Sequence, residues 1–277
     1  DNALQDAFNA IAETKVPVAV HAEDRATLEK AEKSMRHSGR NDAEAFLEAH
    51  PASAEVKAIQ RVSILMKNSG AHVHVCHVSS AAGLDTALKA RKVGLSITCE
   101  VTPHHLLLTS QDAKKQGNVA LTLPPLRTRV DAEALWKALK KGLIDTVASD
   151  HAPHSVEEKS AKSIWDVKPG IAGLETMLPL MLNEVNSGRL SVNELVRLMS
   201  EKPAEIFHLR GRGSLNKGCI ADIVVVDINR EHKIEASRFH SKAKFSPFDG
   251  WKVRGKPVKT FVNGQLVMNE GEIVAKP

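Results

Sequence analysis

The sequence predicts an α/β fold in which parallel βα units precede a small, separate β region. Within residues 1–210, short β-branched runs end in polar residues and are followed by helical stretches, a pattern that recurs four times. From residue 211 to residue 277 the pattern changes to short strands separated by Gly, Asn and Pro. We therefore expect a partial barrel in residues 1–210 and a small β domain in residues 211–277.

Four runs are expected to form the parallel strands, namely residues 16–20, 72–78, 95–101 and 144–149. Helical periodicity is expected between and after them, in residues 26–35, 54–67, 81–92, 131–141, 174–185 and 192–198. Ser79 and Ser80 are suitable caps for the helix that begins at residue 81. In such folds the functional groups lie at the carboxyl ends of the strands.

The C-terminal region is expected to contain three short strands, in residues 221–227, 259–262 and 265–268. Asn263 and Gly264 separate the last two strands, and this pair favours a hairpin turn because both residues tolerate a positive φ angle. We therefore expect these strands to belong to a separate small β region.

Composition excludes several classes of protein. The 277 residues are 42% apolar and 26% charged, which suits one large or two modest globular domains and excludes a membrane span and wholesale disorder. The net charge of +5 comes from scattered basic residues, and with 4% aromatic residues and no Tyr we expect no nucleic-acid partner. Three cysteines cannot form a disulfide framework, so we expect a reducing compartment, the cytoplasm. The chain opens without Met or a signal-peptide pattern, and we expect its start to be a cut.

Polar side chains that suit metal ions or proton transfer lie at the end of each expected strand. In the order of the four runs they are His21, His77, Glu100 and Asp150. Two imidazoles at equivalent strand ends disfavour protonation of each other but suit Zn²⁺. A carboxylate beside them can bind the metal and take a proton from water. The set predicts a hydrolytic metal centre, although each residue alone is also explained as a hydrogen-bonded strand end or, for Asp150, as a helix N-cap.

Two further positions leave alternatives open. Cys76 and Glu100 could supply a thiolate and a carboxylate to an additional metal position, or they could be a small buried residue and a carboxylate paired with a neighbour. The other histidines near these strands are expected to be structural, and they are His72, His74, His104 and His105.

Seven stretches together resemble the dihydroorotases of the amidohydrolase superfamily. They are His21-Ala22-Glu23-Asp24, Cys76-His77-Val78-Ser79-Ser80, Glu100-Val101-Thr102-Pro103-His104-His105, Pro124-Pro125-Leu126-Arg127, Ser149-Asp150-His151-Ala152-Pro153-His154, Gly173-Leu174-Glu175-Thr176 and Ser246-Pro247-Phe248-Asp249-Gly250. Their order and spacing span residues 18–267. The resemblance implies a (β/α)₈ TIM-type barrel, whose strands five to eight would be the four runs, with a small composite β-sandwich and a zinc centre.

The resemblance also implies roles for individual residues. His21 and His77 match zinc ligands of the fifth and sixth barrel strands, and Asp150 matches both a ligand on the eighth strand and the general acid/base. His154 matches a residue that holds the substrate carboxylate, and Ala172-Gly173 matches a loop that contacts the substrate.

The number of zinc ions implied by the resemblance is one to three, with two expected in the complete enzyme. Cys76 and Glu100 match the extra zinc position, which resembles the one in animal-type enzymes.

The sequence departs from the family pattern in two ways. The first metal motif, His-x-His with a following Arg, and the bridging carboxylated Lys or Asp should lie far upstream of His21, and this chain has neither. We therefore expect that an N-terminal part of the family's barrel is missing from this sequence. The second departure is Leu123, which occupies a position where the family has a substrate-contacting Asn. Its apolar side chain cannot donate a hydrogen bond to a carboxylate.

The resemblance implies an enzyme that cyclises N-carbamoyl-L-aspartate reversibly to L-dihydroorotate, a step of pyrimidine (UMP) biosynthesis, with zinc as cofactor. An alternative is a cyclic amide hydrolase of the hydantoinase or allantoinase type, which Leu123 favours because a plain hydantoin has no carboxylate. A second alternative is a non-catalytic scaffold that assembles with aspartate carbamoyltransferase. A homo-oligomer is also expected from the family.

Overall fold

A computed structural model describes residues 2–275 of the chain, and its central element is a parallel sheet. The sheet contains β1 (Val18–Val20), β2 (Val73–Val75), β3 (Ile97–Val101) and β4 (Thr146–Val147). The strands lie in sequential order, β1-β2-β3-β4, and all neighbouring pairs are parallel. This is the order of adjacent strands in a βα barrel, and it confirms the predicted parallel βα units.

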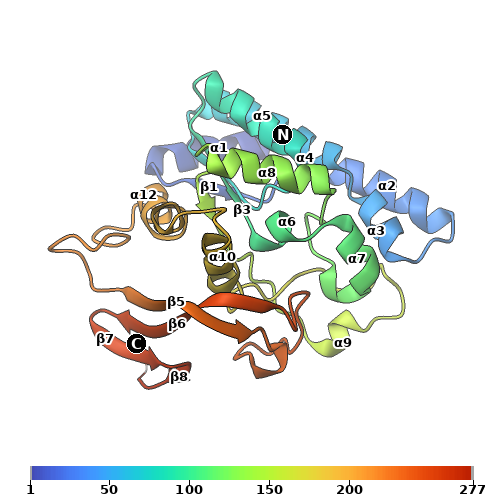
Figure 1. The fold of residues 1–277 in the computed structure, drawn as a ribbon. Coiled ribbons are helices and arrows are strands. Elements are labelled where there is room, and N and C mark those ends of the chain that lie inside the picture. Colours follow the sequence, from blue (N-terminus) through green and yellow to red (C-terminus); the bar gives the residue numbers. More distant parts are fainter. Residues whose placement is uncertain (1, 276–277) are drawn as a thin grey trace.

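Helices cover one face of the parallel sheet (Figure 1). They are α1 (Asn2–Thr14), α4 (Ala52–Ser69), α5 (Ala81–Lys92) and α8 (Arg129–Lys140). Their apolar faces bury Ile59, Leu84 and Leu135 against Val75 and Cys99 of the strands. The opposite side chains of β2 and β3 include His74, Thr98 and Glu100, because successive residues of a strand point to opposite faces.

The remaining helical segments lie in the connections. They are α2 (Arg25–His37), α3 (Ala43–Ala49), α6 (Pro103–Leu107), α7 (Ser110–Gln116), η1 (Gly117–Ala120), α9 (Val156–Lys159), α10 (Met177–Asn186), α11 (Val192–Val196), η2 (Arg197–Glu201), α12 (Lys202–Ile206) and η3 (Ala236–Arg238). The helix expected at residues 81–92 has the predicted bounds. The helix expected at residues 174–185 begins only at Met177, because the backbone before it contacts the end of β4 at Gly173.

The C-terminal sheet is antiparallel. It contains β5 (Ile223–Lys233), β6 (Lys252–Val262), β7 (Gln265–Asn269) and β8 (Glu272–Ile273), in that order. The predicted hairpin joins β6 and β7, and Asn263 and Gly264 have φ angles of 51° and 80°.

The strands β5 and β6 are longer than the sequence predicts. The expected strand at residues 259–262 extends back to Lys252 and includes Pro257. Proline has no N–H to donate, and the pairing of β5 with β6 shifts register beside Pro257, a bulge that accommodates it. The predicted division of the chain between residues 210 and 211 stays a prediction.

Helix α10 lies between the two sheets (Figure 1). Met181 and Leu182 belong to the core of the parallel sheet, whereas Leu180 belongs to a second core with Phe248 and Val253. The backbone of β6 approaches α10 closely at Gly255, where a Cβ atom would lie 2.6 Å from the Leu182 Cβ. A glycine is therefore required for this contact between helix and sheet.

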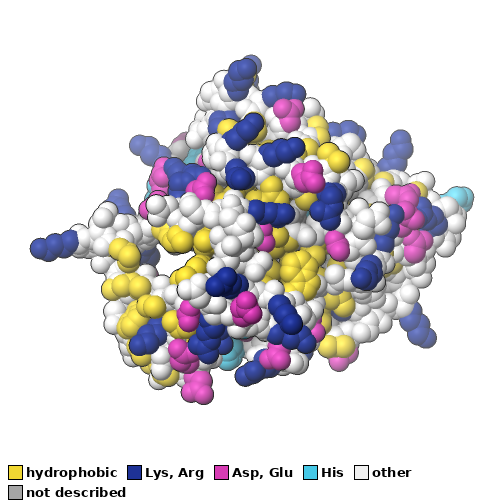
Figure 2. All heavy atoms as spheres, viewed as in Figure 1, with side chains coloured by type: hydrophobic (Ala, Val, Ile, Leu, Met, Phe, Trp, Pro, Cys, Tyr) yellow, Lys and Arg dark blue, Asp and Glu magenta, His cyan; other side chains and the backbone are white. Residues whose placement is uncertain are grey.

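The surface carries charges of both signs. On the face that Figure 2 shows, Lys and Arg side chains are spread among acidic ones rather than gathered in one patch. Among residues 2–275, no helix is both long enough and apolar enough to cross a membrane.

Replacing Gly255 with Ala should destabilise the contact between α10 and β6. Gly255 has a φ of 107°, so the substitution combines backbone strain with the close contact to Leu182. We expect a loss of about 2–4 kcal/mol in the free energy of unfolding, measured by urea denaturation. Gly271→Ala is the matched control, because Gly271 has a φ of 93° but open space around it, and it should lose only about 1–2 kcal/mol. Equal losses in the two variants would contradict this packing.

Candidate metal-dependent active site

Two of the predicted metal ligands meet at the carboxyl ends of β1 and β2. The His21 Nδ1 and the His77 Nε2 lie 3.1 Å apart, with the rings at 67° to each other. Asp150 follows β4, and its charge acts on both imidazoles. His77 and Asp150 have φ angles of 35° and 43°, a left-handed conformation that is uncommon for residues other than glycine. Strained backbone of this kind is common where side chains must be aimed at a functional site.

The structure rejects the alternative role of Asp150 as a helix N-cap. The next helix, α9, begins at Val156, and its N-cap is Ser155, which accepts a hydrogen bond from the Glu158 backbone. Asp150 lies 4.0 Å from the His104 Nε2, measured at its Oδ2. Burial raises the pKa of Asp150 and lowers the pKa of His77, because desolvation disfavours the charged form of each group. A carboxyl of raised pKa is suited to holding and releasing a proton.

A buried carboxylate orients His21. The Glu23 side chain is 1% exposed, and its Oε2 lies 3.2 Å from the His21 Nε2. Glu23 raises the pKa of His21, against the opposing effect of burial. Because Nε2 faces Glu23, Nδ1 is the ring nitrogen that faces His77. A carboxylate behind a histidine fixes the ring and its tautomer in many metal sites.

Arg127 connects this carboxylate to a second one. Its Nη2 lies 3.9 Å from the Glu23 Oε1, and its Nε donates to the Ser79 hydroxyl at 3.0 Å. Its Nη1 donates to the His50 carbonyl. The charge of Arg127 also favours the ionised form of Glu55, although burial of Glu55 raises its pKa overall.

Glu55 fixes the segment that follows His77. Its carboxylate accepts hydrogen bonds from the Ser79 amide at 2.7 Å, the Ser80 amide at 3.1 Å and both serine hydroxyls. Gly83 leaves room for it, because a Cβ there would lie 2.1 Å from the Glu55 Oε2. Ser80 also caps α5, as the sequence predicts. Glu23, Arg127 and Glu55 form a buried charge network that the sequence analysis missed, since its members are far apart in the chain.

Cys76 and Glu100 stay a predicted extra metal position. Glu100 lies 3.1 Å from the His74 Nε2 and accepts a hydrogen bond of 3.3 Å from the His77 backbone. Cys76 is partly buried, and burial raises the pKa of its thiol to about 12. Within residues 2–275, no three His, Cys, Asp or Glu side chains converge closely enough to form a complete metal site.

His104 and His105 are buried on α6, and they differ in their contacts. The Thr102 hydroxyl donates to the His105 Nδ1 at 2.9 Å, and the His105 Nε2 donates to the Pro124 carbonyl at 3.0 Å. Thr102 is the N-cap of α6, and its side chain accepts a hydrogen bond from the His105 amide. His104 has no hydrogen-bond partner at its buried Nε2, the atom that faces Asp150. Burial lowers the pKa of His104 to about 3, so its ring is neutral beside Asp150.

The loop after Asp150 carries the predicted substrate-binding residues. Gly173 packs against the backbone before Asp150, where a Cβ would lie 2.2 Å from the Ser149 carbonyl oxygen, and Ala172 beside it is buried. His151 pairs with Ile171 in a parallel bridge. These contacts bring Ala172-Gly173 to the end of β4.

His154 forms its hydrogen bonds within this loop. Its Nε2 lies 3.1 Å from the Pro169 carbonyl and its Nδ1 lies 3.3 Å from the Glu158 carboxylate. Its predicted contact with a substrate carboxylate stays a prediction.

Leu123 packs on the same loop. It lies partly buried against an apolar cluster that includes Phe46, Leu121, Ile164 and Val167. Ile164 and Val167 belong to the loop between Asp150 and Gly173. Leu123 therefore packs this loop against the segment that contains residues 121–123.

The types of residue at these strand ends fit a zinc ion, although the three side chains do not converge into a complete site among residues 2–275. Two imidazoles and a carboxylate are the ligand types of hydrolytic zinc sites. The His77 Nδ1 and the His104 Nε2 are buried without hydrogen-bond partners. This is unusual, because nearly all buried polar atoms in proteins have such a partner. His21, His77 and Asp150 would hold the metal.

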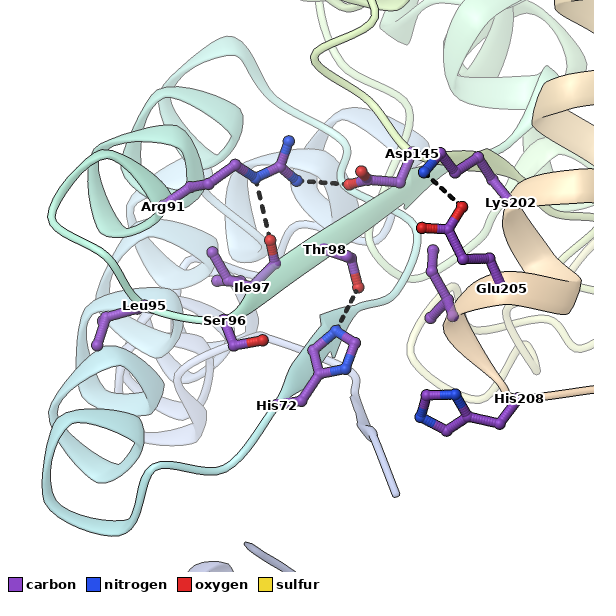
Figure 3. A pocket seen from close by; sticks show the side chains of 11 residues that line it. His72, Arg91, Leu95, Ser96, Ile97, Thr98, Asp145, Lys202, Glu205 and His208 are labelled. Carbon is purple, nitrogen blue, oxygen red and sulfur yellow. Dashed lines mark hydrogen bonds and ion pairs between the residues drawn. The ribbon is translucent and has the colours of Figure 1, made fainter. Parts of the chain in front are cut away.

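A separate cavity of about 460 Å³ lies at the other end of the strands. Figure 3 shows His72, Ser96 and Asp145 on its walls, and these residues precede β2, β3 and β4. Arg91 pairs with Asp145 there, which compensates both charges. The cavity is therefore not part of the site at the carboxyl ends.

The fold is a parallel βα architecture with two imidazoles and a carboxylate at the carboxyl ends of its strands, and comparisons with known proteins identify the family. The model of the Amidohydrolase family matches residues 1–267. The chain belongs to this family.

Its relatives include both hydantoinases and dihydroorotases. The chain is 39% identical to an L-hydantoinase of Paenarthrobacter aurescens, over 100% of this chain and 61% of the relative. It is also 39% identical to a dihydroorotase of Methanothermobacter thermautotrophicus, over 94% of this chain and 58% of the relative. The solved structure of an L-hydantoinase (dihydropyrimidinase) from Arthrobacter aurescens superposes with a TM-score of 0.95 at 38% identity, covering 99% of this chain and 61% of that one.

These matches confirm the predicted fold class. The chain spans about three fifths of the length of the relatives it matches, in agreement with a parallel half-barrel and a C-terminal β sheet. The chain is equally similar to the L-hydantoinase and to the dihydroorotase, so sequence identity does not identify the substrate.

The buried His105 should make the protein sensitive to acid. Burial holds the pKa of His105 well below its ordinary value, whereas the unfolded chain binds this proton near pH 6.5. Stability from this residue is therefore complete above that pH and falls as the pH decreases. His105→Gln keeps a donor for the Pro124 carbonyl but cannot titrate.

Between pH 7 and pH 5, His105→Gln should lose about 2 kcal/mol less unfolding free energy than the unaltered protein. Urea denaturation at several pH values measures this difference. His240→Gln, at an exposed histidine, is the control and should follow the unaltered protein. Parallel pH profiles for His105→Gln and the unaltered protein would show that His105 is not the acid-sensitive group.

Proposed function

We propose that this chain supplies metal-ligating and acid/base groups of a zinc-dependent cyclic amidohydrolase. The observation that carries this proposal is the 3.1 Å approach of His21 and His77 at neighbouring strand ends, with Asp150 beside them. Membership of the Amidohydrolase family and similarity to hydantoinases and dihydroorotases support it.

In this proposal, the protein's own residues have separate roles in hydrolysis. When bound, zinc supplies a Lewis acid that polarises the amide carbonyl of the substrate. Asp150, with its raised pKa, takes the proton from the attacking water and returns it to the leaving nitrogen. The neutral His104 beside it leaves Asp150 without a competing positive charge from that side. Glu23 holds the His21 ring in the orientation that presents Nδ1 to the site.

The first candidate substrate is L-dihydroorotate, formed reversibly from N-carbamoyl-L-aspartate in pyrimidine biosynthesis. His154 would hold the substrate carboxylate, and the Ala172-Gly173 backbone would contact the ring. The dihydroorotase of Methanothermobacter thermautotrophicus and several other dihydroorotases among the relatives favour this candidate.

The second candidate substrate is a hydantoin. Leu123 favours it, because its apolar side chain packs with Ile164 and Val167 and offers no donor to a carboxylate. The L-hydantoinase relatives in sequence and structure support this alternative. A non-catalytic scaffold is the outcome that a protein without bound zinc and without turnover would indicate.

Asp150→Asn should abolish turnover without unfolding the protein. The amide has the shape of the carboxylate but cannot accept the proton, so kcat should fall by roughly 10²–10⁴. Hydrolysis of dihydroorotate and of hydantoin by the full-length protein, followed by ultraviolet absorbance, measures this loss, and thermal unfolding and zinc content are measured on the same samples. His154→Ala is the contrasting variant, expected to raise KM more than it lowers kcat. If Asp150→Asn retained turnover, Asp150 would not be the general acid/base.

Leu123→Asn should shift preference toward dihydroorotate. A new hydrogen bond to the substrate carboxylate should raise kcat/KM for dihydroorotate roughly tenfold relative to hydantoin, since such bonds to charged groups contribute about 1.5–3 kcal/mol. Leu123→Met keeps the apolar volume and should leave the ratio unchanged. If both variants leave the ratio unchanged, the side chain at this position does not select the substrate.

A further inference from the structure

The loop between Asp150 and Gly173 contains a buried cation, Lys159. This last residue of α9 is 4% exposed, and its Nζ donates to the Leu121 carbonyl at 2.9 Å and to the Asn118 carbonyl at 3.1 Å. Among residues 2–275, no carboxylate forms an ion pair with it. Burial lowers the pKa of Lys159 to about 8. A buried ammonium group is unfavourable unless it is hydrogen-bonded, so the two carbonyls determine where this side chain lies.

The contact is reciprocal. The Asn118 side-chain Nδ2 donates back to the Lys159 carbonyl at 2.9 Å. On the other arm of the loop, the Gly170 amide donates to the Leu121 carbonyl at 2.8 Å. Residues 118–121 are therefore held at two points of the loop, by Lys159 at the end of α9 and by Gly170 near the end of the loop. We call these hydrogen bonds between Lys159, Gly170 and residues 118–121 the clasp.

The clasp joins the two segments that carry the predicted substrate-binding residues. One segment leads from residue 121 directly to Leu123. The other begins with His154, whose ring packs at Gly170, since a Cβ there would lie 3.0 Å from the His154 Cδ2. It ends at Ala172-Gly173. The apolar cluster of Leu123, Ile164 and Val167 fills the space between the same two segments.

We propose that Lys159 is a positioning residue that fixes the loop between Asp150 and Gly173 against residues 118–123. It thereby sets the relative positions of Leu123, His154 and Ala172-Gly173, which we call the substrate-binding wall. This inference rests on the proposed function for the identity of that wall, but the clasp itself is a property of the loop. Apolar packing holds two surfaces together without defining their register, because it is non-directional. The directed, charge-assisted hydrogen bonds of Lys159 supply that register.

The test compares Lys159 variants in the full-length, zinc-loaded protein. Lys159→Met keeps the length and the apolar stem but removes the donors, and Lys159→Arg retains a positive donor. Lys162→Met removes an exposed lysine of the same loop and is the matched control. The readouts are backbone hydrogen exchange of residues 155–170, zinc content, and kcat and KM for dihydroorotate and hydantoin.

Lys159→Met should accelerate exchange in residues 155–170 roughly tenfold or more, as expected when buried hydrogen bonds are lost. KM should rise by a similar factor. The zinc content should stay unchanged, and kcat should fall by no more than about threefold. Lys159→Arg should recover at least part of both changes, and Lys162→Met should show neither. Exchange at the unaltered rate in Lys159→Met would overturn the clasp, and accelerated exchange with unchanged KM would overturn its role in substrate binding.

A second variant keeps the test decisive if Lys159→Met does not fold. Asn118→Ala removes the hydrogen bonds that the Asn118 Nδ2 donates to the Lys159 and Ala161 carbonyls, and it should accelerate exchange in the same loop by about threefold or more. Unchanged exchange in this variant would also overturn the clasp. If the unaltered protein hydrolyses neither cyclic amide, the proposed function fails, yet the exchange comparison still decides whether Lys159 holds the loop.

Discussion

The geometry of the candidate site depends on one buried cation placed between two buried carboxylates. Arg127 lies beside Glu23, which faces His21, and it contacts Ser79, which Glu55 holds. A buried charge without its partner is strongly destabilising, so these groups can be accommodated only together. Their positions fix the segments after β1 and β2 relative to each other. The approach of the two imidazoles follows from this constraint rather than from the short strands alone.

The site has two structural parts with different supports. The strand-end part consists of His21, His77 and Asp150, and it is supported by the parallel sheet and the buried charge network. The wall that we assign to substrate binding consists of loops, and it is supported by hydrogen bonds to backbone carbonyls and by a small apolar cluster. Loops on a rigid sheet can change without disturbing the metal ligands, which is a physical reason for different specificities within one fold.

This separation explains why similarity alone leaves the substrate open. The chain is 39% identical to an L-hydantoinase and to a dihydroorotase. Under the proposed function, the groups at the strand ends would serve either of the two candidate substrates. Under the same proposal, the choice between them would depend on residues such as Leu123, whose surroundings are apolar in this structure.

The sequence by itself determined the parallel βα units, the strand-end positions of His21, His77 and Asp150, and the Asn263-Gly264 hairpin. These features follow from local periodicity and turn preferences, which a sequence displays directly. Only the tertiary structure decided the length of β5 and β6, where pairing across the sheet tolerates Pro257 at a bulge.

The contacts of Glu23 with Arg127, of His104 with Asp150 and of Lys159 with Leu121 also depended on tertiary structure. Each joins residues 38 or more positions apart. Periodicity reports which face of an element is buried, but it does not report which distant group will meet a buried polar atom. That pairing is fixed only when the elements pack.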